Sequence, residues 1–120
     1  MEFSESQPIY KQIVDYCHRC IMSGEWREWE RIPSTKDLSV ALGVNNRTVL
    51  KAFDELNESE VIFQKRGLGY FVSSSAPERI RALMRAEFMT KTLPKMIETM
   101  RSLGITREEL LRAFDNYPHQ

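Results

Sequence analysis

The 120-residue chain has no long apolar run, and its first residues are acidic where a secretory signal would have an apolar core. These absences argue against a membrane span and against export. Only two cysteines are present, which disfavours a disulfide scaffold and favours a reducing setting. The length excludes large catalytic frameworks such as an α/β barrel. We therefore expect a small, soluble, cytoplasmic protein that has no membrane partner.

The chain also has no net charge, because its 17 Lys and Arg residues balance its 17 Asp and Glu residues. The first 75 residues hold nine basic and eleven acidic residues, and the remaining 45 hold eight and six. The local distribution is less even. From Lys36 to Lys51 there are three basic residues and one acid, and no acid lies near Lys65 and Arg66. A polyanion could therefore be bound only by a local face, where geometry matters more than bulk charge.

Hydrophobic periodicity predicts three helices in the first half, over 8–23, from Ser34 to Gly43, and from Asn45 to about residue 57. Ser34 and Asn45 are residue types that cap helix N-termini, and Gly43 suits a helix stop. Two short helices joined by a three-residue turn that begins with glycine are typical of a helix-turn-helix.

Two segments rich in β-branched and aromatic residues follow, over 61–66 and 68–72. Gly67 between them can supply the positive φ of a tight connection, so they predict a β-hairpin. The expected fold class is mainly α with a small β-hairpin. It comprises a winged helix-turn-helix domain over residues 1–75 and a short helical dimerisation region over 76–120.

A winged helix binds double-stranded DNA by inserting its second helix-turn-helix helix into the major groove. Residues in the first turn of that helix reach base edges, where Arg pairs with guanine and Asn with adenine. Lysines one turn later, or near the start of the preceding helix, suit phosphates, and the hairpin tip suits phosphate or the minor groove. The predicted DNA-binding residues are Lys36, Asn46, Arg47, Thr48, Lys51, Lys65, Arg66 and Gly67.

The apolar residues of the last 45 positions recur at helical spacing, with Pro94 expected either to kink a helix or to start one. Thr106 and Glu109 form a capping-box pattern for a final helix. A segment this short seldom folds alone, so its apolar face packs on the winged helix or on a second copy. The serine linker favours a second copy and a C2 homodimer. The expected dimer interface contains Ile80, Leu83, Met84, Phe88, Leu93, Met96, Ile97, Met100, Leu110, Leu111 and Phe114.

Residues 8–72 resemble the winged-helix domain of the GntR family of bacterial transcription regulators. The resemblance is carried by short motifs in the family's order: Pro8-Ile9-Tyr10-Lys11-Gln12-Ile13, Ser23-Gly24-Glu25, Arg31-Ile32-Pro33-Ser34 with Leu38, Leu42-Gly43-Val44-Asn45, Arg47-Thr48-Val49 and Gly67-Leu68-Gly69-Tyr70-Phe71-Val72. The short helical tail is similar to that of the YtrA subfamily. The resemblance implies a dimeric repressor, with Lys36 on a phosphate, residues 46–48 on bases and phosphates, and Gly67 at the wing tip.

Three departures from the family pattern leave the operator sequence open. Thr35-Lys36-Asp37 replaces the usual Glu-Arg-Glu type of triplet, Glu60 stands where glycine usually closes the third helix, and Leu50 replaces a frequent polar residue.

Two other functions stay open on the residues alone. Cys17 and Cys20 form a C-x-x-C pattern that could serve a thiol- or metal-responsive regulator. Both fall on the apolar face of a helix and no second pair follows, so we interpret them as packing residues. A winged helix could also serve as a protein-interaction adaptor. The sequence contains no catalytic constellation, so we expect no enzyme; it indicates no cofactor or metal and identifies no small-molecule effector.

Overall fold

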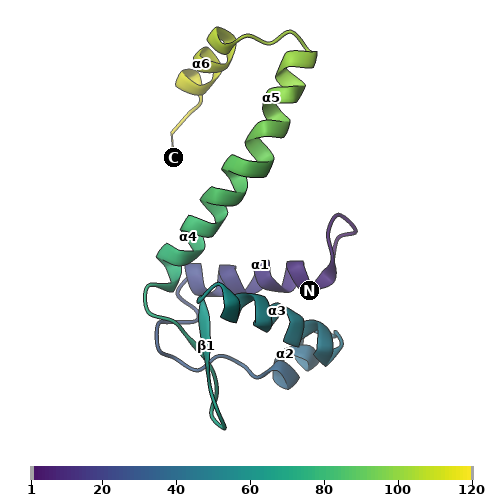
Figure 1. Ribbon diagram of the computed structural model, residues 1–120, viewed down its shortest axis with the longest axis vertical. Helices are drawn as coiled ribbons and strands as arrows, with labels where there is room; N and C mark the ends of the chain where they lie inside the picture. The colour runs from purple at the N-terminus through teal and green to yellow at the C-terminus, as the bar shows by residue number, and fades with distance from the viewer. Residues whose placement is uncertain (1, 120) are drawn as a thin grey trace. The chain divides into compact units, whose positions relative to one another are not determined.

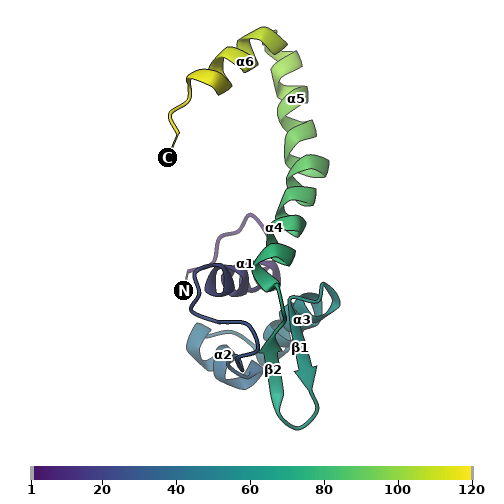
Figure 2. The same cartoon turned by 90° about the vertical axis from the view of Figure 1, so that its left-hand side faces the viewer.

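The computed structural model describes residues 2–119, which divide into two compact units, the first ending at Ala82 and the second beginning at Leu83. The first unit contains three helices and a hairpin, and the fourth helix begins within it (Figures 1 and 2). The elements of the chain are α1 (Ile9–Met22), α2 (Thr35–Leu42), α3 (Asn46–Glu58), β1 (Ile62–Lys65), β2 (Gly69–Val72), α4 (Ala76–Glu87), η1 (Phe88–Thr92), α5 (Leu93–Ser102) and α6 (Arg107–Asn116).

The predicted helix-turn-helix is present as α2 and α3. The Ser34 side chain caps α2 by accepting a hydrogen bond from the Asp37 backbone N–H at 3.0 Å. Gly43 ends this helix in the left-handed region, with φ of 68°. Asn45 then caps α3, since its Oδ1 accepts from the Arg47 backbone N–H at 2.8 Å. The residue types that cap and stop helices thus confirm the predicted boundaries.

The core of the first unit lies between α1, α3 and the hairpin. From α1, Ile13 and Cys17 are fully buried, and from α3 the apolar stripe contributes Val49, Phe53 and Leu56. Each of these five side chains is 0% exposed. The spacing of three and four residues puts the α3 side chains on one face, which leaves the opposite face of the helix to solvent.

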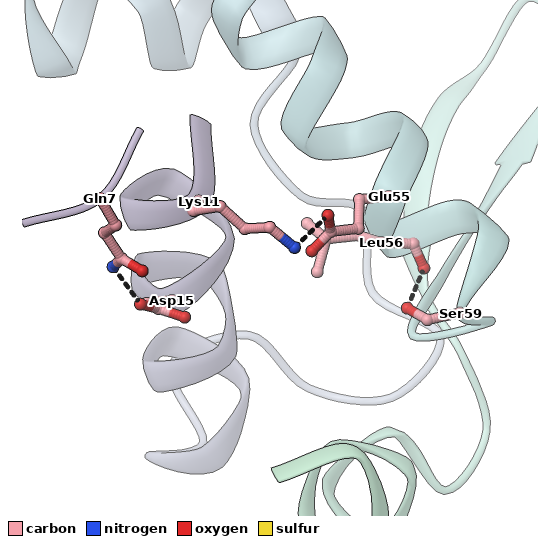
Figure 3. Close-up of polar contacts among 6 residues, drawn as sticks. All are labelled: Gln7, Lys11, Asp15, Glu55, Leu56 and Ser59. Atoms are coloured by element: carbon pink, nitrogen blue, oxygen red, sulfur yellow. Dashed lines mark hydrogen bonds and ion pairs between the residues drawn. The ribbon is translucent and has the colours of Figure 1, made fainter. Parts of the chain in front are cut away.

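An ion pair at the edge of this core also joins α1 to α3. Lys11 Nζ lies 2.7 Å from Glu55 Oε1 (Figure 3). Just before α1, Gln7 Nε2 donates to Asp15 Oδ2 at 2.9 Å, and at the end of α3 the Ser59 hydroxyl donates to the Leu56 carbonyl at 3.2 Å. Of these contacts, only the Lys11–Glu55 pair joins the two helices, and a partly exposed ion pair adds little stability by itself.

The wing is an antiparallel hairpin in which Ile62 pairs with Val72 and Lys65 with Gly69. Gly67 adopts a φ of 77°, and the Leu68 N–H donates to the Lys65 carbonyl at 2.9 Å to close the turn. The glycine therefore supplies the positive φ that the sequence predicted. The loop before α2 contributes one isolated antiparallel bridge to the wing, between Arg31 and Phe71.

Glu60 occupies the left-handed region with φ of 62°, at the position where the family usually has glycine. A residue with a Cβ costs roughly 1–2 kcal/mol there. The Glu60 side chain forms an ion pair, with Oε2 3.1 Å from Arg79 Nη1 of α4, but both side chains are exposed and the pair offsets little of this cost. The departure at Glu60 keeps the backbone turn that ends the third helix and adds an ion pair to the start of α4.

One predicted interface residue belongs to the core instead. Ala76 and Ile80, in the first half of α4, are both 0% exposed and pack in the core of the first unit. Ile80 is therefore not available to a second copy, and the compact unit extends to Ala82 rather than ending at residue 75. Periodicity alone placed Ile80 with the apolar residues that follow it, because all of them share one helical repeat.

The second unit consists of the end of α4, η1, α5 and α6. The segment before Pro94, η1, is π-helical. Proline has no N–H to donate and its ring crowds the preceding turn, and the wider π-helical turn accommodates both effects. Thr106 and Glu109 form the predicted capping box at the start of α6. No described residue of η1, α5 or α6 is buried.

Candidate nucleic-acid interface

The first turn of α3 is open to solvent. Asn46 and Arg47 are exposed, and Thr48 is half-buried at the edge of the helix. Among residues 2–119 the ion pairs are Lys11–Glu55 and Arg79–Glu60, so no carboxylate holds the Arg47 guanidinium. The Asn45 side chain is engaged as the cap, and residues 46–48 therefore supply the groups that can extend from this turn.

Charge is graded along the exposed face of α3. Arg47 and Lys51 lie in its first half, while the exposed acids Asp54 and Glu58 lie in its second half. The backbone dipole adds partial positive charge at the same N-terminal end. A polyanion would therefore be attracted to the first turn and a half of this helix and repelled from its end.

Lys51 lies at the α1 side of this surface. Its ammonium is 4.1 Å from the centre of the Tyr10 ring, a cation–π contact between α3 and α1. The side chain remains exposed, so it can reach a phosphate beside the groove. Lys36, also exposed, lies in the first turn of α2, the helix that precedes α3 in the motif.

The wing tip presents the remaining predicted cations. Arg66 and Gly67 are exposed at the turn, and the Lys65 ammonium lies 5.1 Å from the Phe71 ring centre and 5.9 Å from that of Phe63. The two rings stack 5.7 Å apart on one face of the hairpin. The hairpin tip and α2 both lie on the side of the first unit away from α1 (Figures 1 and 2).

Arg31 is a basic residue of this surface that the sequence did not single out. Its guanidinium lies against Gly69 of β2, where a Cβ would meet Arg31 Nε at 3.0 Å. The absence of a side chain at Gly69 thus makes room for Arg31 on the wing. The contact joins residues distant in sequence, and no local pattern indicates it.

The thiol alternative fits poorly with the environment of the two cysteines. Cys17 is 0% exposed and Cys20 is 6% exposed. Burial raises the pKa of both thiols, so the reactive thiolate is disfavoured at neutral pH. Within the described residues no group of three or more His, Cys, Asp and Glu side chains could hold a metal ion. Both cysteines serve to fill the core beneath α1.

The helix-turn-helix and the hairpin that follows it define a winged helix-turn-helix, a class of DNA-binding fold. None of the helices in residues 2–119 combines the length and apolar character needed to cross a bilayer. Residues 9–72, more than half of the chain, match the family described as bacterial regulatory proteins, gntR family. The chain belongs to this family.

Known proteins similar to the chain include transcription regulators and a DNA-binding domain bound to its operator. The HTH-type transcriptional repressor YtrA of Bacillus subtilis is 32% identical over 71 residues, which is 59% of this chain and 55% of YtrA. A GntR family transcriptional regulator from Listeria monocytogenes superposes with a TM-score of 0.74 at 32% identity, covering 97% of this chain and all of that one. The DNA-binding domain of AraR in complex with operator ORX1 gives a TM-score of 0.56 at 27% identity, covering 61% and 89% of the two chains.

The matches confirm the resemblance to the GntR family and to YtrA that the sequence motifs indicated. They also confirm the winged-helix fold with a helical C-terminal region. The chain is a DNA-binding transcription regulator of this family and not an enzyme.

Proposed function

We propose that this regulator represses transcription by binding as a homodimer to an inverted-repeat operator. The observation that carries the proposal is the open first turn of α3, with an Arg47 that no carboxylate of residues 2–119 holds. The AraR domain bound to its operator and the repressor YtrA support it from similar proteins. A protein with this function would act in the cytoplasm, where the operator DNA is.

The basic and polar residues divide into base-reading and phosphate-binding groups. Arg47 would donate two hydrogen bonds to guanine and Asn46 would pair with adenine, each discriminating by roughly 1–3 kcal/mol. Thr48 and Gly67 would contact the backbone at the edge of the groove and at the wing tip. The cations that would bind phosphates are Lys36, Lys51, Lys65 and Arg66.

The test begins with selection of duplexes from a random pool by the full-length protein, which yields the operator and its symmetry. We expect Arg47→Ala to weaken operator binding and to relax the preference at one base pair of each half-site. Arg19→Ala, at an exposed position in the last turn of α1, is the matched control and should retain both. Unchanged affinity of Arg47→Ala for the operator and for its point variants would contradict base reading.

Exposed apolar side chains support the dimer. Leu111 is 53% exposed and Phe114 is 75% exposed, and α5 buries none of its side chains. Without a partner this much apolar surface would remain in water, which opposes the hydrophobic effect. The segment after Ala82 would act as the dimerisation region, and the buried Ile80 is excluded from the interface. Its proposed members are Leu83, Met84, Phe88, Leu93, Met96, Ile97, Met100, Leu110, Leu111 and Phe114.

Sedimentation at micromolar concentration tests the dimer. The full chain should sediment as a dimer, whereas a chain that ends at Ala82 should be a monomer that retains the buried Ile80. In the full chain, Phe114→Glu should weaken association and the neighbouring exposed Arg112→Glu should change it less. If the full chain and the shortened chain are both monomers, the dimer proposal fails.

A further inference from the structure

Leu50 is an apolar side chain on the face of α3 that the core does not use. The four α3 residues that build the core (Val49, Ala52, Phe53 and Leu56) are each 0% exposed, whereas Leu50 is 41% exposed. Packing within the first unit therefore does not account for a large aliphatic residue at this position. It lies next to the first turn of α3, which we propose reads bases.

Leu50 follows Asn46 by four residues and Arg47 by three, so its side chain adjoins both on the helix surface. It also lies on the cationic first half of α3, one turn before Asp54. If Asn46 and Arg47 reach base edges, Leu50 reaches the neighbouring base pair of the same groove. The inference therefore rests on the proposed DNA-binding function.

The major groove offers one strongly apolar group, the C5-methyl of thymine. Leucine has no hydrogen-bonding group, so against a guanine or adenine edge it would leave acceptors and donors without partners. Against thymine it buries a methyl group instead. We infer that Leu50 is a specificity-determining residue that contacts a thymine methyl in each operator half-site.

Replacing thymine by deoxyuridine tests this contact, because it removes the methyl group and leaves the base-pairing edge and the phosphates unchanged. On the selected operator, each symmetric pair of thymines is replaced in turn, and the dissociation constant of the full-length protein is measured by fluorescence anisotropy. One methyl group is worth about fourfold in affinity per half-site, or about fifteenfold for the symmetric pair.

We expect one thymine pair whose replacement weakens the wild-type protein by this factor and has no effect on Leu50→Ala. Lys51→Ala is the matched control on the same face of α3. It should bind more weakly overall and still distinguish thymine from deoxyuridine at that pair. Circular dichroism and thermal melting confirm that each variant is folded, as expected for substitutions at exposed positions.

If every thymine pair that responds to deoxyuridine responds equally in Leu50→Ala, or if none responds, the inference about Leu50 is overturned. In that event a base preference that Arg47→Ala relaxes would leave the proposed function intact. If the selection recovers no preferred sequence, the proposed function and the inference fail together.

Discussion

Ile80 marks where the DNA-binding unit ends, and its substitution measures this directly. The side chain is 0% exposed and packs in the same core as α1, α3 and the hairpin. Burying an isoleucine fully is worth about 1.5–3 kcal/mol, and a cavity adds to the loss when the side chain is truncated. We therefore expect Ile80→Ala to lower the free energy of unfolding by about 2–5 kcal/mol, and Ile80→Val by about 0.5–1.5 kcal/mol.

The assay follows unfolding in urea through tryptophan fluorescence. Trp26 is 9% exposed in the core of the first unit and reports on its loss. Protein concentration is held fixed, because association contributes to the stability of a dimer. A thermal melt of the same proteins is the second readout: a loss of 1 kcal/mol lowers the melting temperature of a unit of this size by about 4–8 °C, so even Ile80→Val should be resolved.

Arg81→Ala is the matched control, since Arg81 is the exposed neighbour of Ile80 on the same helix. A change of less than about 0.5 kcal/mol is expected there, as at other surface positions. Equal effects of Ile80→Ala and Arg81→Ala would refute the assignment of α4's first half to the core and would restore a boundary at residue 75.

Three further predictions concern local contacts. Asn45→Ala should lower the free energy of unfolding by about 1 kcal/mol in the same urea assay, whereas Asn45→Asp should retain most of the helix cap. Asn57→Ala, at an exposed position of the same helix, should change the free energy of unfolding little. Equal effects of the two alanine variants would contradict the capping role of Asn45. A double-mutant cycle on Lys11 and Glu55, whose side chains are 44% and 35% exposed, should give a coupling free energy of less than about 1 kcal/mol. A larger coupling free energy would mean that water does not screen the pair. Burial raises the pKa of the Cys17 thiol in the folded state. At pH values above about 8.5, the pKa of an unfolded thiol, the unfolded state therefore loses a proton that the folded state keeps, and the free energy of unfolding falls as the pH rises. Cys17→Ala should make this fall less steep in urea titrations at pH 7–10, and an unchanged slope would contradict the argument.

The parts of the fold that follow from local chemistry were predictable. Ser34, Asn45 and Thr106 each cap the helix that their residue type and position indicated. Gly43 and Gly67 take the positive φ that a helix stop and a hairpin turn require. Each of these features depends on a few neighbouring residues, so the sequence alone is sufficient to find it.

Features that depend on distant segments were not predictable. Ile80 continues the same apolar repeat as Leu83 and Met84, and only the packing of Ala76 and Ile80 against the core separates them. Arg31 meets Gly69 through a pairing between the loop before α2 and the wing. Periodicity shows that a face is apolar, and it does not show what covers that face.

The balanced charge of the chain has a consequence for its selectivity. Each phosphate contact contributes about −0.9 to the slope of log K against log salt concentration, so four cations in each of two protomers would give a slope of about −7. The exposed acids Asp54 and Glu58 at the end of α3 oppose any wider contact with the backbone. If the proposed contacts hold, sequence-independent affinity would be limited to those cations, and discrimination between sites would come from the first turn and a half of α3. A regulator with no net charge therefore depends more on its base contacts than a basic one does.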